Sequence, residues 1–230
     1  MINIVFQNEY FVICDKPAGV LCTPSRMGSE DRRPCLGLIL QDDLRMQIYP
    51  VNRLDLEVSG LVLYALHVQA HRIANGWFEH QTVRKDYAAL TFPQSYSHIP
   101  GHIENPRTPI SLKEGEKFEW KGNIMKGKKR AYSAEYGKPT ITEAQFLRNE
   151  GDYLLWNLSP ITGKSHQLRF DLSRHGFPIV GDVLYGSKKN LEKWDEQSIA
   201  LRSYSLDFSK APQALKFGLP QLVTIDSKLA

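Results

Sequence analysis

The chain has 230 residues, of which 42% are hydrophobic and 23% charged, and its formal net charge is +4. This composition is typical of a globular protein that buries a core without disulfides, and it excludes small disulfide-framework classes. No apolar run approaches the roughly 20 residues that span a bilayer, and the segment Met1–Phe6 lacks the features of a signal peptide. We therefore expect a soluble, cytoplasmic protein without membrane contact.

The three cysteines, Cys14, Cys22 and Cys35, are odd in number and lack the spacing of metal ligands. Reduced thiols that are buried or incidental are expected. The sequence also offers neither a cluster of His, Cys and carboxylate residues nor a glycine-rich phosphate loop. We expect no metal and no cofactor.

The N-terminal third is divided by apolar runs and by breaks at Pro and Gly. The patterns predict strands at residues 4–6, 11–14 and 60–66, a mobile polar loop at 23–35 and a short helix at 36–42. The segment Asp15–Val20, which contains Lys16-Pro17-Ala18-Gly19, breaks any regular element after the second strand.

Asp55 is the first candidate for a catalytic residue. It lies in the segment Asn52–Gly60, between a turn and a buried strand and two positions after Arg53. A carboxylate held there can serve as a nucleophile or a base at the edge of a cleft. The same residues also occur as a plain turn, in which Asp accepts backbone hydrogen bonds and Gly supplies backbone freedom. This segment alone leaves both interpretations open.

The remaining patterns predict a helix with apolar residues from Ala70 to Phe78 and strands at residues 83–90, 140–147 and 153–158. A second helix is indicated by Leu168 and Leu172, one turn apart, with Gly176 and Pro178 to end it. Tyr87 lies in one of these strands, where packing is the ordinary role of a tyrosine. Arg169 lies in the second helix, where a surface position is the ordinary expectation.

Residues 92–138 are rich in Pro, Gly, Ser and Lys, and we predict an insertion of irregular hairpins there. The segment from Lys113 to Arg130 contains seven basic and three acidic residues. Its net charge of +4 equals the formal net charge of the whole chain. A solvated loop and an RNA contact explain this segment equally well. Its candidate RNA-binding residues are Lys126, Lys128, Lys129 and Arg130.

Four segments, in order, resemble the motifs of the RluA-type pseudouridine synthases. They are Lys16–Gly19 for K-P-x-G, Asn52–Leu61 for H-R-L-D-x-x-T-S-G-L, Val83–Ala89 for V-x-K-x-Y-x-A, and Thr162–Gly186 for T-G-R-T-H-Q-I-R-V-H-L with G-x-P-I-x-G-D-x-x-Y-G. The chain departs from these motifs at Asn52, Val58, Lys164 and Asp171, which stand for His, Thr, Arg and His. Residues 200–208 resemble the closing strand of the family's catalytic domain, so the resemblance covers about residues 3 to 212.

The resemblance implies an α+β fold with a mixed, largely antiparallel sheet flanked by helices and a central cleft. Residues 1–230 would form a single catalytic domain without the S4 domain of many relatives. It implies an isomerase that converts uridine to pseudouridine with no cofactor. Asp55, Tyr87 and Arg169 would be catalytic, with Arg169 paired to Asp55.

The implied partner is structured RNA, a ribosomal or transfer RNA stem-loop, bound by a monomer. In addition to the four basic residues above, Arg53, Lys16, Lys164 and His166 are candidates for RNA contacts. An RNA-binding assembly factor that keeps the fold without turnover is the alternative. It does not explain a carboxylate in a groove that faces phosphates. An unrelated hydrolase is disfavoured because no Ser/His/Asp or zinc arrangement is visible.

Overall fold

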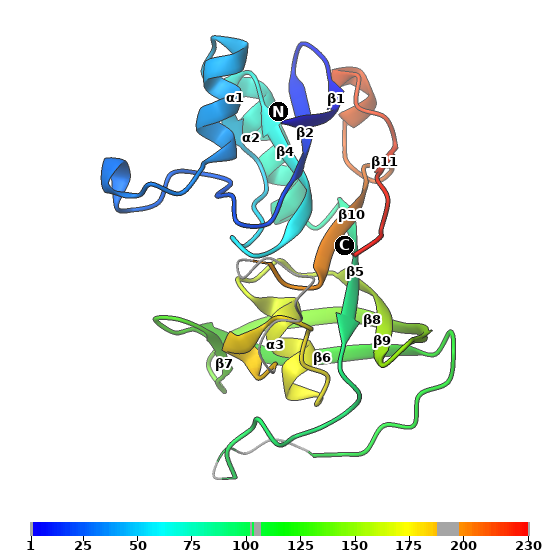
Figure 1. Ribbon diagram of the computed structural model, residues 1–230. Helices are drawn as coiled ribbons and strands as arrows, with labels where there is room; N and C mark the ends of the chain where they lie inside the picture. The colour runs from blue at the N-terminus through cyan, green and yellow to red at the C-terminus, as the bar shows by residue number, and fades with distance from the viewer. Residues whose placement is uncertain (1, 102, 104–106, 188–197, 230) are drawn as a thin grey trace. The chain divides into compact units, whose positions relative to one another are not determined.

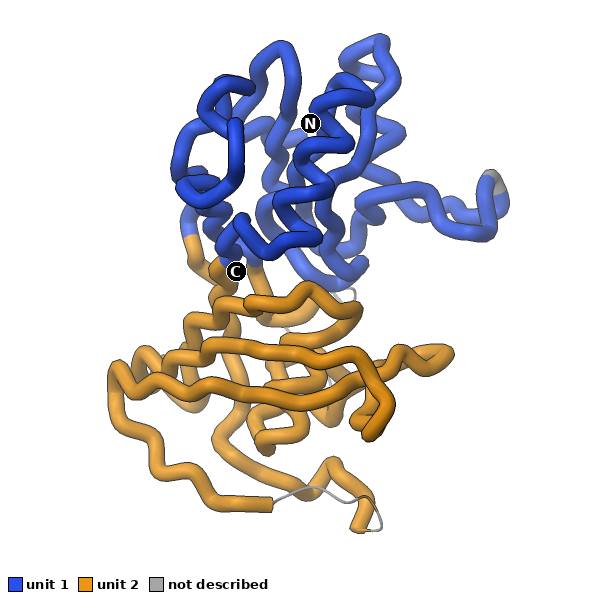
Figure 2. The backbone as a smooth tube through the Cα atoms, turned by 180° about the vertical axis from the view of Figure 1, so that it is seen from behind, with its two compact units in different colours: residues 1–85, 203–226 blue, residues 86–202, 227–230 orange. Residues whose placement is uncertain are grey.

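The computed structural model describes residues 2–101, 103, 107–187 and 198–229. They form two compact units, shown in Figure 2. Unit 1 comprises Met1–Lys85 and Ser203–Asp226, and unit 2 comprises Asp86–Arg202 and Ser227–Ala230. The chain passes from one unit to the other within strands β5 and β10.

Unit 1 is built on a sheet in which β1, β2, β4 and β10 are neighbours in that order (Figure 1). The strands of this unit are β1 (Asn3–Gln7), β2 (Phe11–Lys16), β3 (Tyr49–Pro50), β4 (Ser59–Ala65), β10 (Leu201–Asp207) and β11 (Leu222–Thr224). Gly60 permits the close approach of β4 to β10, because a Cβ atom on it would lie 2.1 Å from the backbone oxygen of Ser203. Its φ of +114° also favours glycine.

The described part of unit 1 contains two α-helices. Helix α2 (Val68–Glu79) buries Ala70, Ala74 and Trp77, whose spacing of three to four residues places them on one face. This face packs on the apolar side chains of β2 and β4 to form the core of the unit. Helix α1 (Leu36–Leu44) is shorter and buries Leu36 and Leu40, one turn apart.

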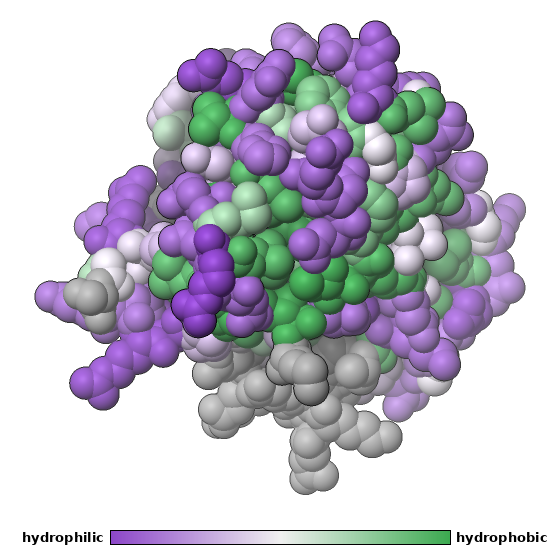
Figure 3. Space-filling view, turned by 90° about the horizontal axis from the view of Figure 1, so that it is seen from above, coloured by the Kyte–Doolittle hydropathy of each residue, from purple (hydrophilic) through white to green (hydrophobic). Residues whose placement is uncertain are grey.

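The surface of unit 1 also carries large apolar side chains. Figure 3 shows hydrophobic residues gathered in the middle of the face seen from above, with hydrophilic residues around and among them. The exposed apolar side chains of this unit include Leu38 and Ile39 of α1 and Leu215 and Leu222 near the C-terminus.

In its described residues, unit 2 is an antiparallel sheet with one α-helix. Its strands follow the order β5 (Arg84–Thr91), β9 (Tyr153–Pro160), β8 (Lys138–Glu150), β6 (Lys117–Lys126) and β7 (Ala131–Ser133). Helix α3 (Gln167–Arg174) contacts β7, β8 and β9. An aromatic cluster centred on the fully buried Trp156 fills the core, and its ring lies near those of Trp120, Phe146 and Phe177.

The predicted strands and helices of both units are confirmed within a few residues at their ends, and so is the α+β class. The insertion at 92–138 differs from the prediction in its second half. There, β6 is a regular ten-residue strand that pairs with β8 along its length. Trp120 and Ile124 are buried while Glu119, Lys121 and Asn123 are exposed, a period-two pattern that the many charged residues concealed.

The short helical turns are η1 (Gly28–Glu30), η2 (Val183–Tyr185) and η3 (Ala214–Phe217). The predicted loop at 23–35 is irregular apart from η1. Residues 102 and 104–106 of the predicted insertion lie outside the described residues.

Candidate functional site

Asp55 lies on a loop that leaves β3 and returns to β4, and these two strands pair with each other. The Val58 amide donates a hydrogen bond to the Asp55 carbonyl at 3.2 Å and closes a turn inside the loop. Leu54 and Val58 are buried, whereas Asp55 is half-buried and Arg53 is exposed. The loop therefore anchors its apolar residues in unit 1 and keeps the carboxylate within reach of solvent.

The side chain of Lys16 binds this loop through hydrogen bonds. Its side chain is fully buried, and its ammonium group donates to the carbonyls of Pro17, Val20 and Leu56 at 2.9, 2.8 and 3.3 Å. Burial penalises the charged form and lowers the pKa of Lys16 to about 8. Because three backbone carbonyls occupy its three protons, the prediction that Lys16 contacts RNA is corrected: it joins two loops of the protein.

Cys22 and Asn52 pin the same loop at two further points. The Leu54 amide donates to the Cys22 sulfur at 3.2 Å, and the thiol lies 3.4 Å from the Leu54 carbonyl, to which it can donate. The Asn52 side-chain oxygen accepts a hydrogen bond from the Leu63 amide of β4 at 2.7 Å. The replacement of the motif's histidine by Asn52 thus gives the loop a bond to its neighbouring strand.

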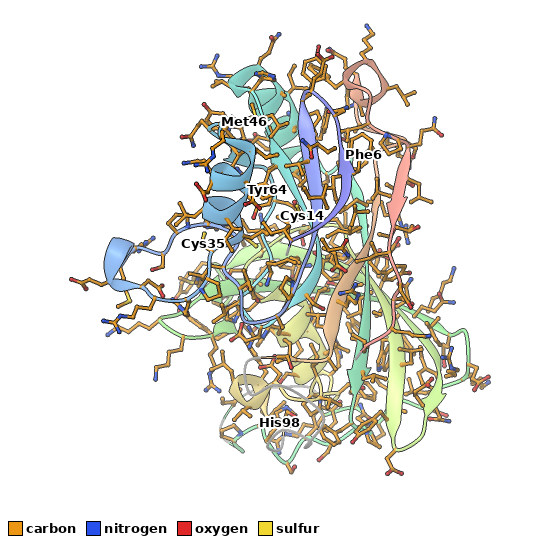
Figure 4. The ribbon with its side chains drawn as sticks, turned by 45° about the horizontal axis from the view of Figure 1, so that its top comes forward. Phe6, Cys14, Cys35, Met46, Tyr64 and His98 are labelled. Carbon is orange, nitrogen blue, oxygen red and sulfur yellow. The ribbon has the colours of Figure 1, made fainter. Side chains whose placement is uncertain are left out.

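All three cysteines are buried, which was one of the two expected alternatives, and none of them forms a disulfide. Figure 4 shows Cys14, Cys35 and Tyr64 close together beside α1. The hydroxyl of the fully buried Tyr64 donates to the Cys22 carbonyl at 2.8 Å, which fixes the backbone that carries the Cys22 thiol. Sequence reasoning treated Cys22 as incidental, and no signal in the sequence links it to Leu54.

In unit 2, Arg169 is a buried residue of α3, with 2% of its side chain exposed. Its Nε and Nη2 atoms donate to the two carboxylate oxygens of Asp182 at 2.7 and 2.8 Å, and Asp182 is equally buried. The ordinary expectation of a surface arginine is therefore wrong. Asp182 was not a candidate, although it belongs to the same motif segment; the pairing of Arg169 with Asp55 stays a prediction.

Tyr185 joins three parts of unit 2. Its hydroxyl accepts a hydrogen bond from the Ala131 amide of β7 at 2.6 Å and lies 3.1 Å from Nδ1 of His166. The guanidinium carbon of Arg169 is 5.3 Å from the centre of the Tyr185 ring, within the range of a cation–π interaction. His166, which precedes α3 with a φ of +57°, is half-buried in this network.

Tyr87 is a buried residue of β5, opposite Leu158 of β9, with 9% of its surface exposed. Asp55 and Arg53 thus belong to unit 1, and Tyr87 and Arg169 to unit 2. Lys85, two residues before Tyr87, is also buried, and burial lowers its pKa to about 8.

The end of α3 contains two groups whose ionisation is opposed by burial. Asp171, fully buried, accepts a hydrogen bond from Thr142 at 2.7 Å and lies 3.2 Å from Nε of Arg174. Burial raises the pKa of Asp171 to about 6, although Arg174 and Thr142 act in the other direction. Burial, and secondarily the charge of Arg174, lowers the pKa of His175 to about 4.

The basic RNA-binding candidates gather at the turn between β6 and β7, where the Gly127 amide donates to the Arg130 carbonyl at 2.9 Å. Lys126, Lys128, Lys129 and Arg130 are all exposed, and Lys164 is half-buried at the start of the α3 segment. Within the described ranges, no helix has the length and hydropathy of a membrane span. No three His, Cys, Asp or Glu residues of the same ranges gather in a way that could hold a metal ion.

Residues 10–174 match the family model described as RNA pseudouridylate synthase. The chain is 27% identical over 99% of its length to the tRNA pseudouridine synthase C of Haemophilus ducreyi, and covers 91% of that protein. It is 30% identical over 80% of its length to the dual-specificity RNA pseudouridine synthase RluA of Pasteurella multocida, and covers 77% of it. Its fold is similar to that of human RNA Pseudouridylate Synthase Domain Containing 1, with a TM-score of 0.67, 23% identity, and coverage of 90% of this chain and 78% of that one.

Proposed function

From the premise that this chain belongs to the RNA pseudouridylate synthase family, we propose that it isomerises specific uridines of structured transfer or ribosomal RNA with Asp55 as the catalytic carboxylate. As a member of this family the chain is an isomerase that converts uridine to pseudouridine in RNA. The observation that carries the role of Asp55 is its loop, pinned through Asn52, Leu54 and Leu56 so that one half-buried carboxylate is held in place.

The reaction breaks the bond between N1 of uracil and C1′ of ribose, turns the base and rejoins it through C5. It involves no redox change and no net addition of water. Asp55 acts as the nucleophile or the base of this reaction, and Arg169, whose guanidinium binds Asp182, is assigned a supporting role. Tyr87 lies against the uracil and helps to move the C5 proton.

A uridine in a folded RNA reaches a protein pocket only when it is extruded from its stack. We assign Arg53, exposed beside Asp55, to the space that the base vacates. Lys164, His166 and the basic turn between β6 and β7 contact the RNA around it. The proposal takes the protein to act as a monomer in the cytoplasm.

The proposal is tested with transcripts labelled with tritium at C5 of uridine, because formation of pseudouridine releases this label. Asp55→Asn removes the charge while it preserves shape, so we expect RNA binding and thermal stability to remain and product to disappear. Glu57→Gln, which changes another carboxylate of the same loop, serves as the matched control and retains turnover. Turnover of Asp55→Asn near that of the wild type would exclude Asp55 as the catalytic group.

Detection of pseudouridine also tests the alternative, an RNA-binding assembly factor. Pseudouridine mapping of total RNA from cells with and without the gene identifies the modified position. Binding to RNA with no modified position in either experiment would favour the assembly factor.

A further inference from the structure

Two exposed tyrosines lie beside the basic turn of unit 2. All ten tyrosines of the chain are described, and only Tyr132 and Tyr136 are exposed, at 43% and 84%. They flank the end of β7, within six residues of the basic turn. We call these two rings together with Lys126, Lys128, Lys129 and Arg130 the tyrosine–lysine face.

The Tyr132 ring lies over the turn. Tyr132 pairs with Met125 across the β6–β7 hairpin, and its hydroxyl is 3.8 Å from the Met125 sulfur. A Cβ atom on Gly127 would lie 3.4 Å from the ring. The hairpin therefore holds this ring beside the cations of the turn and leaves nearly half of its surface to solvent.

Tyr136 belongs to the neighbouring turn, which connects β7 to β8 and is tied to β6. The Ala134 amide donates to the Asn123 carbonyl at 3.2 Å, and the Asn123 side chain donates to the Glu135 carbonyl at 3.1 Å. The Gly137 amide closes the turn on the Ala134 carbonyl at 2.9 Å. Tyr132 on β7 and Tyr136 on this turn are thus both fixed to the same strand, β6.

The charge around the rings is strongly positive. Residues 126–138 contain five basic side chains and one acidic side chain, a net +4 that equals the formal charge of the whole chain. The four cations of the face form no ion pair with any residue that the structure describes. Their charge is therefore available to the phosphates of a nucleic acid.

The combination of rings and cations favours one form of RNA. An aromatic side chain stacks on any base whose face is uncovered, and nearby cations bind the adjoining phosphates. In a duplex the faces of the bases are already stacked, so exposed rings add nothing there. We propose that the tyrosine–lysine face binds unpaired nucleotides of the substrate RNA, with Tyr132 and Tyr136 stacked on bases; this proposal rests on the proposed function.

The β6–β7 hairpin is fixed to the rest of unit 2 by a hydrogen bond. Tyr185 accepts the hydrogen bond of the Ala131 amide, and Ala131 is the residue before Tyr132 and is 3% exposed. The same Tyr185 ring faces Arg169. The face is therefore attached through Tyr185 to the part of unit 2 that also carries Arg169.

The test compares Tyr132→Leu/Tyr136→Leu with Tyr132→Phe/Tyr136→Phe, because phenylalanine keeps the ring and leucine does not. Affinity is measured by fluorescence anisotropy for a single-stranded 12-nucleotide RNA and for the same sequence in a duplex. We expect the leucine variant to lose roughly tenfold in single-strand affinity for each ring that stacks, with no change for the duplex or in the salt slope. The phenylalanine variant keeps its affinity.

Three results would overturn the proposal: unchanged single-strand affinity of the leucine variant, an equal loss for the duplex, or an equal loss in the phenylalanine variant. Melting temperatures of both variants should match the wild type because the rings are exposed. Tritium release separates this proposal from the catalytic one. If the protein releases no tritium but its single-strand affinity still depends on the two rings, the proposed function is refuted and the proposal for the tyrosine–lysine face stands.

Discussion

At the scale of single residues, three buried side chains fix the groups around them through hydrogen bonds. Lys16 and Cys22 bind the backbone of the Asp55 loop, and Arg169 binds Asp182 with both carboxylate oxygens. A buried polar group contributes most when every partner is present, since an unpaired one costs its full desolvation. Each of these residues therefore couples stability to the geometry of a candidate catalytic group.

Cys22→Ala tests the loop anchor. It removes the acceptor of the Leu54 amide, and an unpaired buried amide costs about 1–3 kcal/mol. We expect the free energy of unfolding to fall by that amount and single-turnover catalysis to fall by roughly ten- to a hundredfold, because a misplaced catalytic group loses rate steeply. Cys14→Ala, at another buried thiol, is the control. A similar loss of rate in both variants would contradict a specific role for Cys22.

Arg169→Met tests the buried ion pair. It leaves the Asp182 carboxylate buried without its guanidinium, which should lower the free energy of unfolding by about 3–5 kcal/mol. Arg169→Met/Asp182→Asn removes the stranded charge, so urea denaturation should show part of that stability restored. Turnover should stay low in both variants because the guanidinium is absent in each. Wild-type melting and turnover of Arg169→Met would show that the pair serves neither purpose.

At the scale of elements, the C-terminal end of helix α3 holds Asp171 and His175. Their contributions to the free energy of unfolding change with pH in opposite directions. The folded protein holds the Asp171 proton more tightly than the unfolded chain, since the pKa rises from 3.8 to about 6. The stability that this supplies is complete below pH 3.8 and is lost as the pH rises through about 6. The pKa of His175 falls from 6.5 to about 4, so its contribution is complete above pH 6.5 and is lost as the pH falls through about 4.

Asp171→Asn should remove the contribution of Asp171 to the pH dependence of stability and leave that of His175. We expect the free energy of unfolding of the variant to rise with pH between about 4 and 6.5, more steeply than that of the wild type. The difference should be on the order of 2 kcal/mol over this range. Urea denaturation at several pH values measures it, with Asp152→Asn at an exposed turn as the control. Parallel pH profiles for Asp171→Asn and the wild type would show that Asp171 ionises like an exposed carboxylate.

At the scale of the whole molecule, positive charge is concentrated in one short segment and not spread over the surface. The net +4 of residues 126–138 equals that of the entire chain. Neutralisation of phosphates by such a segment releases counterions, which makes the affinity for RNA depend on salt. The rest of the chain carries no net charge, so we expect this segment to contribute a large share of the dependence.

Replacement of Lys126, Lys128 and Lys129 by Gln tests this concentration of charge. Each lysine that neutralises a phosphate contributes about −0.7 to −0.9 to the slope of log affinity against log salt. We expect the triple variant to bind more weakly, to lose roughly two units of slope, and to keep its single-turnover rate at saturating enzyme. Replacement of Lys210, Lys216 and Lys228 in the same way is the control. An unaltered slope in the first variant would mean that the turn is only a solvated surface.

Most elements and the family could be predicted from local patterns, because strand alternation, helix periodicity and the four motif segments are encoded by neighbouring residues. β6 was missed because its charged residues occupy the exposed half of a regular alternation. Lys16 was a candidate for an RNA contact, and a lysine is ordinarily exposed. Only the fold shows that three carbonyls surround its ammonium group.

The sequence by itself determined the family, the α+β class and the candidates Asp55, Tyr87 and Arg169, since these depend on residue identity and on spacing along the chain. The tertiary structure alone decided the partners of the buried groups: Leu54 for Cys22, 32 positions away, and Asp182 for Arg169, 13 positions away. It also decided which two of the ten tyrosines are exposed. Burial and hydrogen-bond partnership depend on segments distant in sequence, and no local pattern of residues records them.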